Sequence, residues 1–284
     1  MNVCRFHEGD GRVRVGLVSE SSVLDLAPAG IDRLQQLLET ENPAAELRKF
    51  TGARLPRLEL SQVKLCPPVE RQEVWAAGVT YLRSKTARMD ESDFDATAYD
   101  RVYGAERPEL FFKSMPEKVA GPGDSVGIRR DARWNVPEPE LALVLNSRGQ
   151  VAGLTIGNDM SSRDIEGENL LYLPQAKIYR HSCALGPWIR IGAEEPAARQ
   201  WTIRVAVQRG SQSVFEGETS IGQMKRSFGE LADFLFRSQV FPHGAILLTG
   251  TGIVPPETFT LNEADVITIE ISGIGVLTNE VAVV

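Results

Sequence analysis

Three acidic residues in this chain have types and spacing that could hold a metal ion. Glu138 and Glu140 stand two residues apart in the apolar stretch 136–145, and Asp159 ends a second apolar stretch that follows the turn at 146–149. Two apolar stretches around a turn that contains glycine predict a β-hairpin. Because side chains two residues apart in a strand share a face, Glu138 and Glu140 are expected to lie together.

The pairing of this hairpin decides whether Asp159 joins the two glutamates. We assume a register in which Leu145 lies opposite Gln150, which puts Asp159 on the face of Glu138 and diagonal to it. A slip of one residue would move Asp159 to the other face. The predicted cluster therefore depends on the register.

Three carboxylates on one face repel one another unless a cation neutralises them. Oxygen ligands without a nearby Cys or His favour a hard divalent ion, Mg²⁺ first and then Mn²⁺ or Ca²⁺. With only three protein ligands, the ion would keep positions open for the carboxylate and keto oxygens of a 2-oxo acid, and would stabilise the enolate formed when a proton leaves C3. The alternative interpretation is a solvated acidic face on an exposed strand.

Four other residues are candidates for the same site. Lys177 lies in the largely uncharged stretch 171–179, where it is either a surface lysine or a proton carrier. Glu109 and Lys113 flank an aromatic pair, and the sequence alone indicates ordinary charged residues at the ends of a strand. Thr251 lies in a Thr-Gly-Thr-Gly sequence that forms either a tight turn or a site for a substrate carboxylate.

The elements that must position these residues are mostly strands. Short apolar runs bounded by turn residues predict strands at 12–18, 74–77, 141–145, 151–156, 203–207, 245–248 and 266–271. Helical spacing is present at 31–50, where Pro43 should interrupt the helix, and at 224–236. We expect a small N-terminal domain over 1–70, a β-rich catalytic domain over 71–284, and a mobile lid in the charged segment 81–107.

Composition narrows the class of protein. The chain has 284 residues, 42% of them hydrophobic and 24% charged, which is ordinary for a globular protein. A net charge of −7 argues against a nucleic-acid partner, and no apolar run is long enough for a membrane span. Three well-separated cysteines and no signal peptide lead us to expect a cytoplasmic protein with reduced thiols.

These motifs together resemble the fumarylacetoacetate hydrolase family over about residues 71–284. The resemblance rests on the sequence VPEPELA at 136–142, on GNDMSSRDI at 157–165, and on Lys177 ten residues before Pro187-Trp188. It implies a mixed, β-rich (α+β) fold with a β-roll core, a homodimer or larger homo-oligomer, and a divalent metal. By position, Glu138, Glu140 and Asp159 would be the metal ligands, and Lys177 the active-site lysine.

Within that family, the stretches 107–113, 167–179 and 249–251 resemble the branch of 2-dehydro-3-deoxy-D-arabinonate dehydratases. That likeness implies loss of water from a 2-keto-3-deoxy sugar acid to give 2,5-dioxopentanoate, with Lys177 and Glu109 as proton carriers and Lys113 and Thr251 as substrate contacts. The C–C hydrolases of the family use a lid histidine, and residues 78–115 contain none.

Two alternatives stay open at this point. The first is a C–C hydrolase or decarboxylase of a β-diketo or 2-oxo acid that uses the same metal enolate. The second is a non-catalytic, metal-stabilised sensor of sugar acids. Detection of a semialdehyde product would separate the dehydratase from both.

Overall fold

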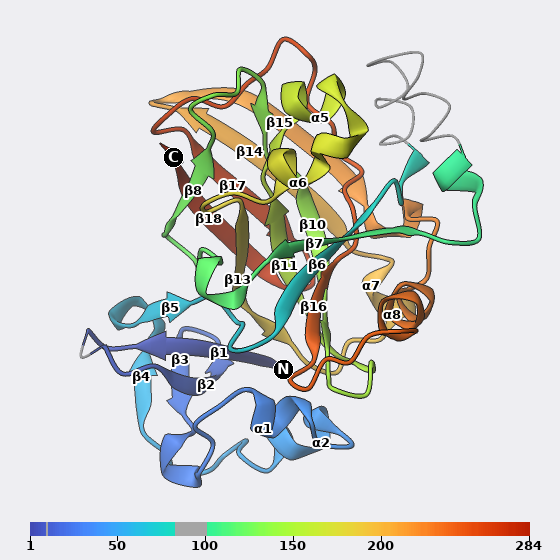
Figure 1. Ribbon diagram of the computed structural model, residues 1–284. Coiled ribbons are helices and arrows are strands. Elements are labelled where there is room, and N and C mark those ends of the chain that lie inside the picture. The colour runs from blue at the N-terminus through green and yellow to red at the C-terminus, as the bar shows by residue number, and fades with distance from the viewer. Residues whose placement is uncertain (10, 83–100) are drawn as a thin grey trace.

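The computed structural model describes residues 1–9, 11–82 and 101–284 (Figure 1). The segment 81–107, which we expected to form a lid, therefore lies largely outside the described residues. Of the helices that the structure does describe, none combines the length and the apolar character that a membrane crossing would need.

Eleven strands of the described residues form one mixed sheet, in the order β4-β3-β2-β1-β13-β11-β10-β16-β6-β7, with β5 paired to β1. The strands are β1 (Asn2–His7), β2 (Arg14–Ser19), β3 (Ser22–Asp25), β4 (Arg57–Glu59), β5 (Lys64–Cys66), β6 (Glu73–Gly78), β7 (Glu109–Ser114), β10 (Pro139–Leu145), β11 (Val151–Asp159), β13 (Cys183–Arg190) and β16 (Ala245–Leu248). Only β16 and β6 run parallel among these pairs. The apolar runs at 74–77, 141–145, 151–156 and 245–248 thus form strands, as predicted.

A second sheet has the order β15-β14-β17-β18-β8, and β9 pairs with β12. These strands are β8 (Ser125–Ile128), β9 (Asn135–Val136), β12 (Ser161–Ser162), β14 (Thr202–Arg209), β15 (Gln212–Ser220), β17 (Val266–Ile271) and β18 (Gly275–Val283). Leu141 and Leu143 of β10 belong to the same core cluster as Val205 and Ile269 of the second sheet. The alternate residues of β10, Ala142 among them, pack into a second core on the opposite face. Strand β10 is therefore buried on both faces, which explains its nearly continuous apolar sequence.

The helices described are short: α1 (Gln35–Leu38), α2 (Pro43–Arg48), α5 (Arg163–Glu168), α6 (Leu173–Lys177), α7 (Glu195–Ala198) and α8 (Phe228–Phe236). Pro43 begins α2, and the Asn42 side chain accepts a hydrogen bond from the Ala45 N–H at 2.9 Å. The predicted helix with an interruption at Pro43 is thus two separate helices. Proline is favourable at the first position of a helix, because the backbone N–H at that position has no hydrogen-bond partner within the helix and its absence costs nothing. Helix α8 starts later than predicted, after its cap Ser227.

The strands of residues 1–70 extend the large sheet. Asn2 and Val3 of β1 pair with Arg190 and Ile189 of β13, and Figure 1 shows these N-terminal strands in blue at one end of the molecule. Backbone hydrogen bonds therefore join the segment 1–70 to β13, which pairs in turn with β11, the strand that carries Asp159. The division of the chain at residue 70 into two domains stays a prediction.

Candidate active site

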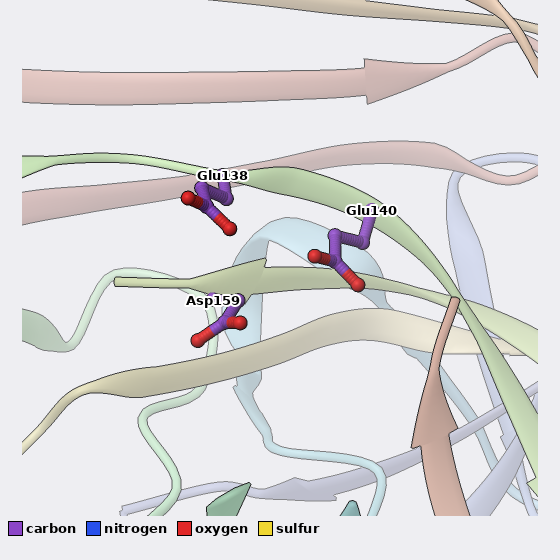
Figure 2. Close-up of side chains that lie close together, drawn as sticks. All are labelled: Glu138, Glu140 and Asp159. Carbon is purple, nitrogen blue, oxygen red and sulfur yellow. The ribbon is translucent and has the colours of Figure 1, made fainter. Parts of the chain in front are cut away.

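The hairpin of β10 and β11 brings Glu138, Glu140 and Asp159 together. Glu140 lies opposite Gly157, and the Asp159 N–H donates to the Glu138 carbonyl oxygen at 2.9 Å. Each side chain offers a carboxylate oxygen, and these oxygens lie within 4.8 Å of one another. Figure 2 shows the three carboxylates pointing into the same space from two neighbouring strands. We call these three residues the acidic triad.

The register that we assumed from the sequence was wrong by two residues at this end of the hairpin. Leu145 pairs with Val151, not Gln150, and the pairing shifts again between Val144 and Leu145 at a β-bulge. The turn shifts the pairing by one residue relative to the assumed register, and the bulge shifts it by one more, so the total shift is two residues. Because strand side chains alternate with a period of two, an even shift keeps the same residues on the same face. Asp159 consequently lies directly opposite Glu138 instead of diagonal to it.

The acidic triad is buried, and its negative charges are unevenly compensated. Glu138, Glu140 and Asp159 are 4%, 2% and 2% exposed. Lys177 pairs with Glu138 and Asp159, Lys113 pairs with Asp159, and Arg163 approaches Glu138 at 3.4 Å. The remaining member, Glu140, is thus the one whose charge needs another source of compensation.

Among the described residues, Glu140 has no ion-pair partner. Its Oε2 accepts a hydrogen bond from the Gly250 N–H at 2.6 Å. Burial, and then the negative charges of Asp159 and Glu138, raise the pKa of this carboxyl well above its usual range. An ionised carboxylate in such a place is costly without a cation. The site therefore fits a divalent ion with hard oxygen ligands, held by all three members of the triad.

Lys177 reaches into the same site from the C-terminal end of α6. It is 2% exposed, and its Nζ donates to Glu138 Oε2 at 2.7 Å, Asp159 Oδ2 at 3.1 Å and Ser161 Oγ at 2.6 Å. The interpretation of Lys177 as an ordinary surface lysine is therefore wrong. Its Nζ lies among the ligands of the predicted metal.

Lys113 lies behind the triad. It is fully buried, forms an ion pair with Asp159, and donates to the carbonyl oxygens of Met160, at 3.0 Å, and Lys177. It is not one of the residues that line the cavity in front of the triad. Lys113 therefore contacts Asp159 and the end of α6, and the substrate contact that we expected of it stays a prediction.

Glu109 and Thr251 both line that cavity, together with the triad and Lys177. Glu109 begins β7 opposite Gly78, and a side chain at position 78 would overlap the Glu109 carboxylate. Thr251 follows Gly250, whose φ of +89° is a conformation that favours glycine. The Thr-Gly-Thr turn therefore presents the Gly250 N–H to Glu140 and places Thr251 at the cavity wall.

Sequence reasoning missed two charged residues of this cavity, Arg163 and Glu166. Both lie on α5, are 2% and 4% exposed, and line the cavity. The signal was present, because residues three apart in a helix share a face and Arg163 follows Asp159 by only four positions. We had used this stretch only as a family motif and had not assigned it to a helix.

Known proteins resemble this chain over most of its length. The family model described as fumarylacetoacetate (FAA) hydrolase C-terminal matches residues 74–282. A probable 2-keto-3-deoxyxylonate dehydratase of Haloferax volcanii is 44% identical over 217 residues, which cover 76% of this chain and 74% of that protein. The 2-dehydro-3-deoxy-D-arabinonate dehydratase of Saccharolobus solfataricus is 35% identical over 272 residues, 93% of this chain and 91% of that one.

A solved structure of 2-keto-3-deoxy-D-arabinonate dehydratase, complexed with magnesium and 2,5-dioxopentanoate, superposes with a TM-score of 0.81 at 31% identity. The match covers 100% of this chain and 99% of that one. It confirms the mixed, β-rich fold that the motifs implied. With a family model that spans most of the chain and relatives above 30% identity, the chain belongs to the fumarylacetoacetate hydrolase family.

Proposed function

We propose that this protein is a magnesium-dependent dehydratase of a 2-keto-3-deoxy sugar acid, of the 2-dehydro-3-deoxy-D-arabinonate type, and that it forms 2,5-dioxopentanoate. The observation that carries the proposal is the buried acidic triad with the Lys177 Nζ hydrogen-bonded to two of its members. Relatives named as dehydratases of such acids, at 35% and 44% identity, support the substrate class.

The triad would hold Mg²⁺ through one carboxylate oxygen from each of Glu138, Glu140 and Asp159. When bound, the ion would bind the carboxylate and keto oxygens of the substrate and stabilise negative charge on the keto oxygen. Lys113 and Arg163 hold two of these carboxylates in place from outside the set of ligands. Such support fixes the orientation of the ligands before substrate arrives.

Two cavity residues would carry the protons of water loss. C3 of the substrate adjoins the keto carbon held at the triad, and Lys177 is the proton carrier that contacts the triad directly. We therefore propose that Lys177, as a neutral amine, removes the C3 proton. Glu109, which lines the same cavity from β7, would protonate the departing C4 hydroxyl. Thr251 lies at the cavity wall, where we expect it to contact the substrate.

The test is a screen of 2-keto-3-deoxy pentonates and hexonates with Mg²⁺, in which the semialdehyde product is trapped and water loss is followed. We expect semialdehyde from at least one pentonate, loss of turnover after chelation, and recovery with Mg²⁺ or Mn²⁺. Formation of two carboxylates or CO₂ instead would identify the hydrolase or decarboxylase alternative. Full turnover by metal-free protein would contradict the metal dependence.

The proposal includes a homodimer or larger homo-oligomer that works in the cytoplasm. Its support is the resemblance to a family of mostly dimeric enzymes and the three cysteines, Cys4, Cys66 and Cys183, which are all free thiols. Light scattering of the purified protein tests the assembly, and a single mass near 31.2 kDa would contradict it.

A further inference from the structure

Water loss alone does not produce 2,5-dioxopentanoate, and this inference, which depends on the proposed function, concerns the step that must follow. Removal of a C3 proton and the C4 hydroxyl from a 2-keto-3-deoxy pentonate gives 5-hydroxy-2-oxopent-3-enoate. That compound is an isomer of 2,5-dioxopentanoate. To become the product, C5 must lose one hydrogen and its hydroxyl proton, while C3 and C4 each gain a proton.

The isomerisation is a sequence of proton transfers, and its order is set by acidity. The C5–H bond becomes acidic only when the C3=C4 double bond conjugates it with the keto group. A base then removes the C5 proton, a C4=C5 bond forms, the C3=C4 electrons move to C2=C3, and the keto oxygen takes the charge. Protonation at C3 leaves a C5 enol, which loses its O–H proton as C4 is protonated. C5 is oxidised and C3=C4 is reduced, so the step needs no external oxidant.

The cavity contains a carboxylate that the water-loss step does not use. Apart from the triad, the described residues that line it include three side chains of the kinds that serve as general acids or bases: Lys177, Glu109 and Glu166. Arg163 also lines it, but a guanidinium does not serve as a general base in proteins. Lys177 is assigned to removal of the C3 proton and Glu109 to protonation of the C4 hydroxyl. Glu166 is therefore the remaining candidate for removal of the C5 proton.

The placement of Glu166 on α5 matches the position that C5 would take. The helix begins at Arg163, which is 2% exposed and lies 3.4 Å from Glu138, and it ends at the exposed residues 167 and 168. It therefore runs outward from the triad. At about 1.5 Å of rise per residue, Glu166 lies roughly 4.5 Å farther along the helix than Arg163, on the same face. A substrate held by C1 and C2 at the triad would direct its C5 end away from the triad, which in this proposal is the side of Glu166.

We propose that Glu166 is the catalytic base that removes the C5 proton and so converts the enone formed by water loss into 2,5-dioxopentanoate. The protein would then catalyse two linked reactions in one cavity, an elimination at C3 and C4 and an isomerisation at C5. Only acids that carry a hydrogen and a hydroxyl on C5 would complete both reactions.

The experiment compares Glu166→Gln with the wild type in Mg²⁺, and follows the conjugated enone by ultraviolet absorbance and the semialdehyde by trapping. We expect Glu166→Gln to lose water at close to the wild-type rate and to accumulate enone. Conversion of enone to semialdehyde should slow by roughly 10²–10⁴-fold, the usual contribution of a general base. Glu168→Gln, an exposed glutamate on the same helix, is the matched control and should behave like the wild type.

A second measurement uses substrate with deuterium at one of the two C5 positions, prepared in each configuration. An enzyme base removes only one of the two hydrogens, so wild-type semialdehyde should keep the deuterium from one isomer and lose it from the other. A mixture from both isomers would mean that solution tautomerisation makes the product, and would overturn the proposal. Enone that does not accumulate in Glu166→Gln, or water loss that falls as far as semialdehyde formation, would overturn it as well.

Folding of the variant is checked by the melting temperature with and without Mg²⁺. If Glu166→Gln does not fold, Glu166→Asp, which keeps the carboxylate, takes its place and should slow only the enone step. Absence of water loss by wild-type protein on every 2-keto-3-deoxy acid would instead refute the proposed function. The two failures are therefore distinguishable.

Discussion

Replacing Glu138 or Glu140 by glutamine should abolish metal binding in both cases, but only Glu138→Gln should destabilise the metal-free protein. Glu138 lies between Lys177 and Arg163, so Glu138→Gln leaves two buried cations short of a counter-charge. Glu140 has no ion-pair partner among the described residues, and a glutamine there can still accept the hydrogen bond from Gly250. Glu140→Gln therefore removes only a buried carboxyl that favours its neutral form.

The expected sizes follow from these contacts. Breaking a buried ion pair by removing one partner costs about 3–5 kcal/mol, and we expect the lower end for Glu138→Gln because Lys177 keeps Asp159. At about 2 °C per kcal/mol for a chain of this size, the metal-free melting temperature should fall by about 6 °C. Glu140→Gln should leave it unchanged or higher. Mg²⁺ at about a hundred times its dissociation constant should add about 2.7 kcal/mol to the free energy of unfolding of the wild type. This corresponds to a melting temperature higher by about 5 °C.

The assay is thermal unfolding of wild type, Glu138→Gln and Glu140→Gln, each in chelator and in a series of Mg²⁺ concentrations. The wild type alone should show a Mg²⁺-dependent rise in melting temperature. Equal destabilisation of the two metal-free variants would refute the charge assignment. A wild-type Mg²⁺ shift that persists in Glu140→Gln would remove this residue from the ligand set.

Three further substitutions test the remaining parts of the site. Lys177→Met should lower turnover by roughly 10²–10⁴-fold while binding of a 2-oxo acid analogue persists, and near-normal turnover would exclude Lys177 from the mechanism. Gly78→Ala should displace the Glu109 carboxylate, so steady-state kinetics should show a lower kcat, with Mg²⁺ affinity as the unchanged control. Lys113→Met should lower the metal-free free energy of unfolding in urea by about 3 kcal/mol, because Asp159 loses a fully buried counter-charge; a change below about 0.5 kcal/mol would contradict that.

The acidic triad could be predicted from the sequence because it depends on parity alone. Glu138 and Glu140 share a face whatever the pairing, and Asp159 reaches that face for every even shift of the register. The register itself could not be predicted, because the bulge beside Leu145 has no clear sequence signature. The same limitation explains why the direct pairing of Asp159 with Glu138 came only from the structure.

The surroundings of the triad were harder to predict, because they depend on contacts between segments far apart in the chain. Lys113 and Lys177 are 64 residues apart, and nothing local indicates that the side chain of one meets the backbone of the other. Helix α5 has six residues, too few for a helical period to stand out, so Arg163 and Glu166 were not assigned to a common face. Strand positions with alternating or continuous apolar residues were predictable, whereas short helices that cover a cavity were not.

The pairing of β1 with β13 has a practical consequence for recombinant work on the catalytic region. A fragment that starts at residue 71 would lack β1 and would leave the backbone N–H and C=O groups at the Ile189–Arg190 end of β13 without partners. Apolar faces that now pack against Leu34, Leu37 and Leu47 would meet solvent in the same fragment. An open strand edge beside newly exposed apolar surface promotes edge-to-edge association. Expression trials that trim the chain to its family-matched segment should therefore yield insoluble material, and the first 70 residues belong in every crystallisation or screening sample.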